Sequence, residues 1–251
     1  LLNIACKYMF RNNHTEVAAD CRIFCNAFVF AVKSCTGNDF RHINDSNVYA
    51  IFNGVICCNC RMNLTEVADY LTIINNNAGN GEVGLAALLK AGRVRKMICS
   101  FPRQVDSQIF DDLYRRGKVE LELVPQGNLA ARIQAAGAGL GAVFTPTGYG
   151  TPLAEGKETR EIDGRHYVLE YPIKADFALI KAHQGDRWGN LVYRKAARNF
   201  GPIMATAAKT TIVEVSQLVA LGDLDPENII APGIFVQRVF SLENLTAAQR
   251  A

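Results

Sequence analysis

The sequence predicts an α/β fold in which a mostly parallel β-sheet is covered by helices on both faces, a three-layer α/β/α sandwich. Two observations support this fold class. From Leu71 onward, short apolar segments typical of buried strands alternate with segments whose apolar residues recur at helical spacing. The segments between the expected strands are long enough to hold a helix, and parallel strands need connections of that kind.

Five segments are expected to be strands because they are short and rich in Val, Ile, Leu and Phe. They are residues 71–74, 96–100, 119–124, 177–182 and 210–215. Helices are expected between them, over residues 83–91, 107–116, 129–133 and 195–208. Asn128 is placed as the N-terminal cap of the third helix, because an asparagine side chain accepts hydrogen bonds from the free N–H groups of a first turn.

Residues 160–172 predict a different local structure, an antiparallel hairpin. Asp163 and Gly164 stand between two β-like segments, and this dipeptide favours a tight two-residue turn. We expect the hairpin to form a flap on the α/β core.

Composition excludes several classes of protein. The net charge of +3 comes without a long basic stripe, so we expect no nucleic-acid partner. No run of about 18 apolar residues is present, so we expect no membrane partner and a soluble, cytoplasmic protein.

Residues 1–63 differ from the rest of the chain. They hold seven of the eight cysteines and several asparagine clusters, and they lack sustained helical or strand periodicity. We leave them unassigned and interpret them as the product of a frame error, a wrong start or a chimeric gene. The folded domain is expected over residues 64–251.

Two other interpretations of residues 1–63 were weighed. A zinc site would draw on the histidines and cysteines of this segment: His14, Cys21, Cys25, His42 and the cysteines of residues 56–60. Cys21 and Cys25 are separated by three residues and no second clean pair follows, so no metal is expected. A secreted disulfide domain is equally weak, because the rest of the chain has the composition of a cytosolic protein.

Three loops are expected to form a ligand site, because ligands of open parallel sheets bind beyond the carboxyl ends of the strands. They are residues 75–82, residues 125–128 and the glycine-rich run of residues 137–151. Glycine allows backbone N–H groups to approach a ligand closely. The same glycines could instead form a tight packing corner, and the pattern alone does not decide between the two.

No nucleophile motif, phosphate-binding loop or metalloprotease motif appears in the chain. Cys99 lies in an expected strand and is interpreted as a buried small hydrophobe. His166 and His183 are interpreted as structural or surface residues, and Asp186, Trp188, Gly189 and Asn190 as a turn between strands. The residues alone therefore predict a ligand-binding α/β domain without an obvious catalytic group.

Five segments in order carry a family resemblance: LTIINNNAGNGEVGLAALL, VELELVPQGNLAARIQAAGAGLGAVFTPTGYGT, EGKETREIDGRHYVLE, ADFALIKAHQGDRWGNLVYRKAARNFGP and IIAPGIFVQRV. From about Asp69 to Val239 the chain resembles the A (alpha) subunit of a family I CoA-transferase. CSFPRQVDS and GDRWGNLVYRKAARNFGPIMA are similar to the 3-oxoadipate branch of that family.

The resemblance implies a three-layer fold and a reaction. CoA would move from succinyl-CoA to 3-oxoadipate, in the β-ketoadipate pathway of aromatic catabolism. The transfer would be ping-pong, through a glutamyl thioester on a partner B subunit, in an assembly of two A and two B chains. No cofactor is implied, because the CoA thioester is a substrate.

The resemblance also implies site residues. Gln126 matches the family glutamine that stabilises the oxyanion formed when a carboxylate attacks the thioester. The positions expected to bind substrate or CoA are Asn76, Gly127, Thr145, Thr147 and Gly148.

One departure from the family bears on folding. The alpha chain of the family begins with a strand, a glycine-rich V-G-G-F-G-x-x-G-x-P loop and a helix, and this motif is missing here. We therefore expect a sheet that lacks its first strand and exposes unpaired backbone. Three alternatives stay open: the same transfer with acetoacetate or another short 3-oxo acid, a non-catalytic acyl-CoA-binding remnant, and a metal-binding module fused to a transferase domain.

Overall fold

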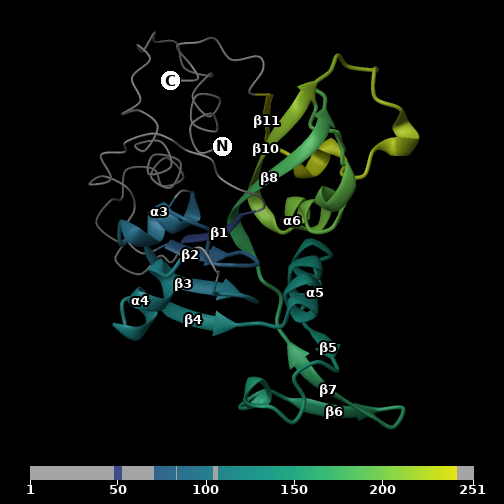
Figure 1. Ribbon diagram of the computed structural model, residues 1–251. Helices are drawn as coiled ribbons and strands as arrows, with labels where there is room; N and C mark the ends of the chain where they lie inside the picture. Colours follow the sequence, from purple (N-terminus) through teal and green to yellow (C-terminus); the bar gives the residue numbers. More distant parts are fainter. Residues whose placement is uncertain (1–47, 53–70, 83, 104–106, 242–251) are drawn as a thin grey trace, which may run out of the picture.

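The computed structural model describes residues 71–82, 84–103 and 107–241 with their side chains, and residues 48–52 by their backbone. This part of the chain forms a large parallel sheet, a small antiparallel sheet and helices that cover the large sheet (Figure 1). None of the described helices is long and apolar enough to cross a membrane.

The large sheet, called the main sheet below, has the strand order β11-β10-β8-β1-β2-β3-β4, and every pair of neighbours in this order is parallel. All five expected strands are confirmed within it. Its strands are β1 (Val48–Phe52), β2 (Leu71–Ile74), β3 (Val94–Cys99), β4 (Glu120–Leu123), β8 (Ala175–Gly185), β10 (Ala208–Leu218) and β11 (Arg238–Ser241), and the short β9 (Leu191–Val192) pairs antiparallel with β8. The order runs outward from β1 in both directions, as in doubly wound α/β folds.

β1 shows that the expectation of a missing first strand was wrong. Ala50 pairs with Ile73 of β2 on one side and with Phe177 of β8 on the other, so β1 joins the two halves of the main sheet. Its sequence, VYAIF, has four residues of high β propensity. The polar, asparagine-rich flanks hid this short strand. The cysteines and histidines weighed as a zinc site lie outside the described residues.

Helices cover both faces of the main sheet, which confirms the three-layer fold. α3 (Leu85–Lys90) and α4 (Ile109–Arg115) lie together on one side of the sheet, and α5 (Gln126–Gly137) and α6 (Gly201–Thr206) lie on the other (Figure 1). Right-handed crossover connections explain why the helices divide between the two faces. From β1 the strands are added in one direction through β2, β3 and β4 and in the opposite direction through β8 and β10, so right-handed connections place their helices on opposite faces.

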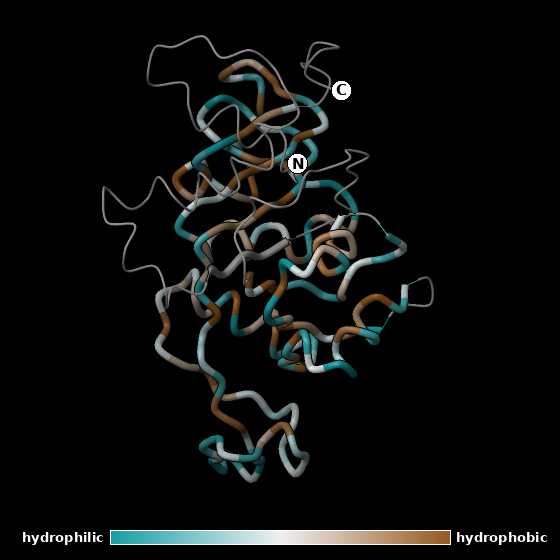
Figure 2. The backbone as a smooth tube through the Cα atoms, turned by 90° about the vertical axis from the view of Figure 1, so that its left-hand side faces the viewer, coloured by the Kyte–Doolittle hydropathy of each residue, from teal (hydrophilic) through white to brown (hydrophobic). Residues whose placement is uncertain are grey.

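The core lies between the main sheet and its helices. α5 buries Leu129 and Ile133, which are one helical turn apart, against a cluster that includes Ile180, Met204 and Val213. All four residues of β2 are buried, as expected for a strand covered on both faces. Figure 2 shows hydrophobic stretches throughout this main body, whereas the projecting part is largely pale or hydrophilic.

The projecting part is the small sheet, with the strand order β5-β7-β6 and antiparallel pairing. Its strands are β5 (Val143–Thr145), β6 (Thr159–Ile162) and β7 (Arg165–Glu170). The expected hairpin is confirmed: Asp163 and Gly164 have φ angles of 51° and 74°, the two positive values that a tight turn of this type requires. β5 was not expected, because it lies inside the glycine-rich run.

Candidate functional site

The candidate site lies at the carboxyl ends of β2, β3 and β4 of the main sheet, and this end of the sheet is called its carboxyl edge below. Backbone hydrogen bonds continue past the strands and hold their ends together: Asn75 N–H donates to the Ile98 carbonyl (3.1 Å), and Val124 N–H donates to the Cys99 carbonyl (3.0 Å). Neighbouring strands lie about 4.8 Å apart, so the ends of β2 and β4 are about 10 Å apart. Two of the predicted loops, residues 75–82 and 125–128, therefore open on the same edge.

Asn76 lies directly beside Ser100 at this edge. The Asn76 carbonyl accepts hydrogen bonds from the backbone N–H groups of Ser100 (3.2 Å) and Phe101 (2.9 Å). Asn76 Oδ1 and Ser100 Oγ are both buried and have no hydrogen-bond partner among the described residues. Since buried polar atoms are nearly always hydrogen-bonded, these two atoms are suited to a ligand or a water molecule. Ser100 was not among the predicted site residues, because the expected strand 96–100 included it, whereas β3 ends at Cys99.

Gln126 is the first residue of α5. The prediction that Asn128 caps this helix was wrong, because the cap is Pro125, three residues earlier, whose carbonyl accepts from Leu129 N–H (2.8 Å). Gln126 and Gly127 are exposed, and the N–H groups of a first turn have no partner within the helix. The helix dipole adds partial positive charge at this end. The first turn of α5 is therefore suited to bind developing negative charge.

Asn128 joins the first turn of α5 to the third predicted loop. Its side-chain Nδ2 donates to the Thr147 carbonyl (3.0 Å) and to Glu170 Oε1 (3.2 Å), and the residue is only 2% exposed. The structure thus brings Gln126 and Gly127 together with the loop that holds Thr147 and Gly148.

The loop of residues 145–150 is held by a hydrogen bond to Thr151 and by a ring stack on β7. Thr145 is buried at the end of β5, and its Oγ1 has no hydrogen-bond partner within the described residues. Gly148 has a φ of 97°, and its carbonyl accepts a hydrogen bond from Thr151 Oγ1 (2.7 Å). Tyr149 stacks on His166 of β7, with ring centroids 4.4 Å apart. The loop therefore has a defined shape beside α5.

The two interpretations of the glycine-rich run apply to different glycines. Gly137 is a packing glycine, because a Cβ there would overlap the side chain of Thr206 on α6. Gly148 has room for a Cβ, and its positive φ is what favours glycine. The run thus combines a close helix contact with a shaped loop.

A series of ion pairs with alternating charge, called the charge chain below, connects β3 and β4 through α5 to the small sheet. Lys96 Nζ lies 2.6 Å from Glu122 Oε2, and Arg132 Nη1 lies 2.8 Å from Glu122 Oε1. Arg132 Nε lies 3.8 Å from Glu170 Oε2, and Lys157 Nζ lies 2.8 Å from Glu170 Oε1. Burial acts to raise the pKa of Glu122, but the hydrogen bonds and charges of Lys96 and Arg132 outweigh it and hold that pKa below its ordinary value.

Comparison with known proteins decides the family. Residues 62–242 match the family described as Coenzyme A transferase. The chain belongs to the coenzyme A transferase family. It is 75% identical over 181 residues to the A subunit of 3-oxoadipate CoA-transferase from Pseudomonas putida, covering 72% of this chain and 78% of the relative. It is 52% identical over 169 residues to the A subunit of succinyl-CoA:3-ketoacid coenzyme A transferase from Xanthomonas campestris, covering 67% and 69%. Both relatives are named as one subunit of their enzymes, which implies a partner of a second kind.

Solved CoA-transferases share the fold. An Escherichia coli acyl-CoA transferase, solved as a thioester complex with CoA, superposes with a TM-score of 0.64 at 20% identity. The match covers 80% of this transferase chain and 47% of the other. Glutaconate coenzyme A-transferase of Acidaminococcus fermentans gives 0.57 at 20% identity, covering 69% of this chain and 62% of the other. The chain thus spans less than two thirds of either solved protein.

The remaining polar candidates of the transferase chain are Cys99, two histidines and the Asp186 turn. Cys99 is fully buried, and burial raises the pKa of its thiol to about 12, so it is not a thiolate at neutral pH. His166 is exposed in its ring stack, and His183 is half-buried on β8. Residues 186–190 form the expected turn, in which the Asp186 carboxylate accepts from the N–H groups of Trp188 (2.9 Å) and Asn190 (3.1 Å). Within the described ranges no group of three or more His, Cys, Asp or Glu could hold a metal ion.

Proposed function

We propose that the chain is the A subunit of a 3-oxoacid CoA-transferase that moves CoA from succinyl-CoA to 3-oxoadipate together with a B subunit. The observation that carries the proposal is the placement of Gln126, exposed on the first turn of α5 at the carboxyl edge of the main sheet. The 75% identity to the corresponding chain of a 3-oxoadipate CoA-transferase supports the choice of acid.

The chemistry needs a group that stabilises an oxyanion. When a carboxylate attacks the thioester carbonyl, negative charge develops on the carbonyl oxygen. The Gln126 side-chain amide and the first N–H groups of α5 are donors at one place, and preorganised donors of this kind lower the barrier where charge develops. The attacking glutamate is assigned to the B subunit. The single described cysteine, Cys99, is too buried to compete with it.

The substrate is assigned to the surface between the three loops. Asn76 and Ser100 offer side-chain groups at the ends of β2 and β3, and Gly127 offers backbone N–H at the start of α5. Thr145, Thr147 and Gly148, in the loop that Asn128 ties to α5, are assigned to the same binding surface. The proposal includes a cytoplasmic assembly of two A and two B chains, and no cofactor other than the CoA thioesters themselves.

Acetoacetate or another short 3-oxo acid is the second candidate acceptor. It is favoured by the relative at 52% identity, which is named as part of a succinyl-CoA:3-ketoacid coenzyme A transferase. Rates of CoA transfer to 3-oxoadipate and to acetoacetate, measured on one preparation, separate the two candidates.

The test is thioester exchange by this chain co-expressed with a B subunit. We expect 3-oxoadipyl-CoA to form from succinyl-CoA and 3-oxoadipate only when both chains are present. Gln126→Ala should lower kcat/KM by roughly 100- to 1,000-fold. Gln134→Ala is the matched control, because Gln134 is an exposed glutamine two turns further along the same helix. Equal rates for the two variants, or binding of acyl-CoA without exchange, would contradict the proposal.

A further inference from the structure

Two buried polar side chains meet between α5 and the small sheet, at a point that the transfer chemistry does not itself use. Asn128 of α5 is 2% exposed and Glu170 of β7 is 3% exposed. Asn128 Nδ2 donates to Glu170 Oε1 (3.2 Å) and to the Thr147 carbonyl (3.0 Å). One amide therefore links α5, β7 and the loop of residues 145–150.

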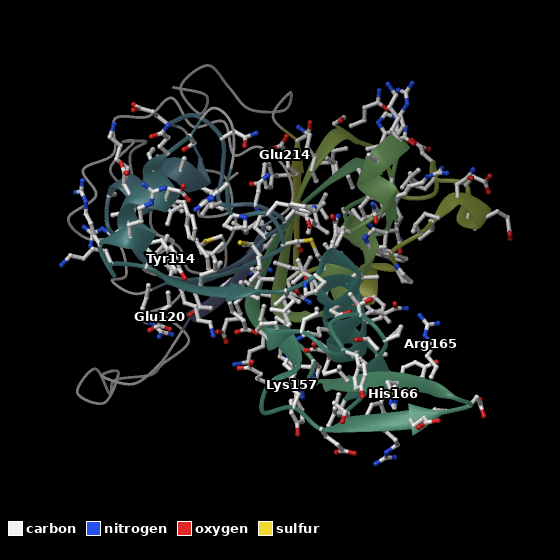
Figure 3. The ribbon with its side chains drawn as sticks, turned by 60° about the horizontal axis from the view of Figure 1, so that its bottom comes forward. Tyr114, Glu120, Lys157, Arg165, His166 and Glu214 are labelled. Atoms are coloured by element: carbon white, nitrogen blue, oxygen red, sulfur yellow. The ribbon has the colours of Figure 1, made fainter. Side chains whose placement is uncertain are left out.

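The Glu170 carboxylate is itself fixed by two cations. Lys157 Nζ donates to Glu170 Oε1 (2.8 Å), and Arg132 Nε lies 3.8 Å from Glu170 Oε2. Arg132 Nε also donates to the Tyr171 carbonyl (2.8 Å), which ties α5 to the end of the small sheet. Figure 3 shows Lys157 toward one end of the small sheet and Arg165 and His166 toward the other.

The first turn of α5 buries two side chains: Leu129 packs in the apolar core, and Asn128 makes the polar contacts. Gln126 is exposed, and Gly127 carries no side chain and would meet no atom within 4 Å if it had a Cβ. Asn128 is the first residue of the helix whose side chain is buried. Hydrogen bonds fix direction as well as distance, so a buried polar contact defines the position of this turn more narrowly than apolar packing would.

We infer that Asn128 and Glu170 are positioning residues for the transfer reaction, holding the first turn of α5 and the loop of residues 145–150 in fixed relation to each other. The inference rests on the proposed role of Gln126. The small sheet then acts as a support that reaches the first turn of α5 through the hydrogen bond between Asn128 and Glu170. A displacement of about 1 Å at a reacting centre can cost roughly 100-fold in rate.

Two substitutions at one position separate the hydrogen bond from the charge. Glu170→Gln removes the negative charge but keeps an oxygen that can accept from Asn128, whereas Glu170→Ala removes both. We expect Glu170→Ala to lower kcat of the A–B complex by roughly 10- to 100-fold. Glu170→Gln should stay within a few-fold of wild type, although both variants lose the ion pairs with Lys157 and Arg132. Equal losses in the two variants would overturn the inference.

A double-mutant cycle tests whether the effect passes through Gln126. In a Gln126→Ala background, Glu170→Ala should cost no more than about twofold, because the group it positions is already gone. Independent, multiplying losses would show a general structural defect instead. Thr211→Val is the control for loss of a buried hydrogen bond, because Thr211 lies on β10, in the other half of the main sheet, and its Oγ1 donates to the Ala205 carbonyl (2.8 Å). It should lower the melting temperature and leave kcat unchanged.

A second measurement keeps the inference distinct from the proposed function. If the wild-type complex transfers no CoA, the proposed function fails, but hydrogen exchange still reports on the coupling. Amides of residues 129–132 and 147–151 should exchange faster in Glu170→Ala than in Glu170→Gln or Thr211→Val. Unchanged exchange in these two segments would overturn the inference whatever the activity.

Discussion

The main sheet and the small sheet use different physical means to stay folded. β2 of the main sheet is buried at every position, and β8 is buried at most of its positions. β6 of the small sheet is exposed at all four of its positions. The first arrangement derives its stability from removal of apolar surface from water. The second depends on a tight turn, on cross-strand contacts such as Arg160 over the Phe144 ring (4.8 Å), and on the charged contacts where it meets α5.

The difference predicts which kind of substitution should destabilise each sheet. In the main sheet, stability depends on side-chain volume, because the interior is close-packed. In the small sheet, backbone conformation and polar contacts should matter more than volume. The two regions meet at the charge chain of Lys96, Glu122, Arg132, Glu170 and Lys157, so a substitution there probes the junction.

The largest expected effect comes from removing volume in the main sheet. Ile73 of β2 is fully buried, and Ile73→Ala should lower the free energy of unfolding by about 2–5 kcal/mol. Ile162→Ala makes the same chemical change on β6, where the side chain is 39% exposed, and should cost about 0.5 kcal/mol or less. Urea unfolding of both variants checks the pair. Similar losses would mean that the two sheets do not differ as described.

A smaller effect is expected from the backbone of the hairpin turn. Gly164→Ala should cost about 1–2 kcal/mol, because Gly164 has a φ of 74° while its added Cβ would meet no atom within 4 Å. Gly164→Asn should cost less, since asparagine tolerates this conformation. Thermal unfolding and hydrogen exchange in β6 and β7 measure the difference. An alanine variant as stable as the asparagine variant would contradict the assignment to backbone strain.

The smallest effect is expected at the junction and depends on pH. The folded-state pKa of Glu122 lies below its ordinary value of 4.5, so this carboxylate contributes stability that is present above about pH 4.5 and is lost as the pH falls through the folded pKa. Glu122→Gln should therefore lower the free energy of unfolding by about 1 kcal/mol at pH 7 and reduce its dependence on acid. Melting temperatures between pH 7 and pH 3 measure this, with Glu161→Gln on the exposed β6 as the control. A wild-type profile no steeper in acid than that of Glu122→Gln would contradict it.

Sequence periodicity was enough to predict most of the main sheet. The segments that became β2, β3, β4, β8 and β10 are apolar and well separated, and Asp163-Gly164 marked the hairpin. The short strands β1, β5, β9 and β11 were not among the expected strands. β1 has strand-favouring residues but lies among polar residues without periodicity, and β5 is a three-residue strand inside a glycine-rich run, so neither gives a sustained local pattern.

The candidate site was predictable in outline but not in its connections. Asn76 and Gln126 follow strands, and the parallel arrangement places such positions at one edge. The contact between Asn128 and Glu170 joins residues 42 positions apart, one of them an asparagine that sequence preference assigned to a helix cap. A pairing of this kind arises from how the small sheet packs on α5, which no local pattern in the chain describes.

The position of β1 at the centre of the main sheet has a consequence for the order of folding. Ala50 pairs with Phe177, so the two halves of the sheet join only after a long stretch of chain has been made and its loop closed. β2, β3 and β4 follow one another along the chain and can associate earlier during synthesis. Such non-local contacts slow folding, and β1 and β8 present unpaired edges until they meet. Assembly of the whole sheet should therefore be the slow step, and the nascent protein most prone to aggregation just before β8 emerges.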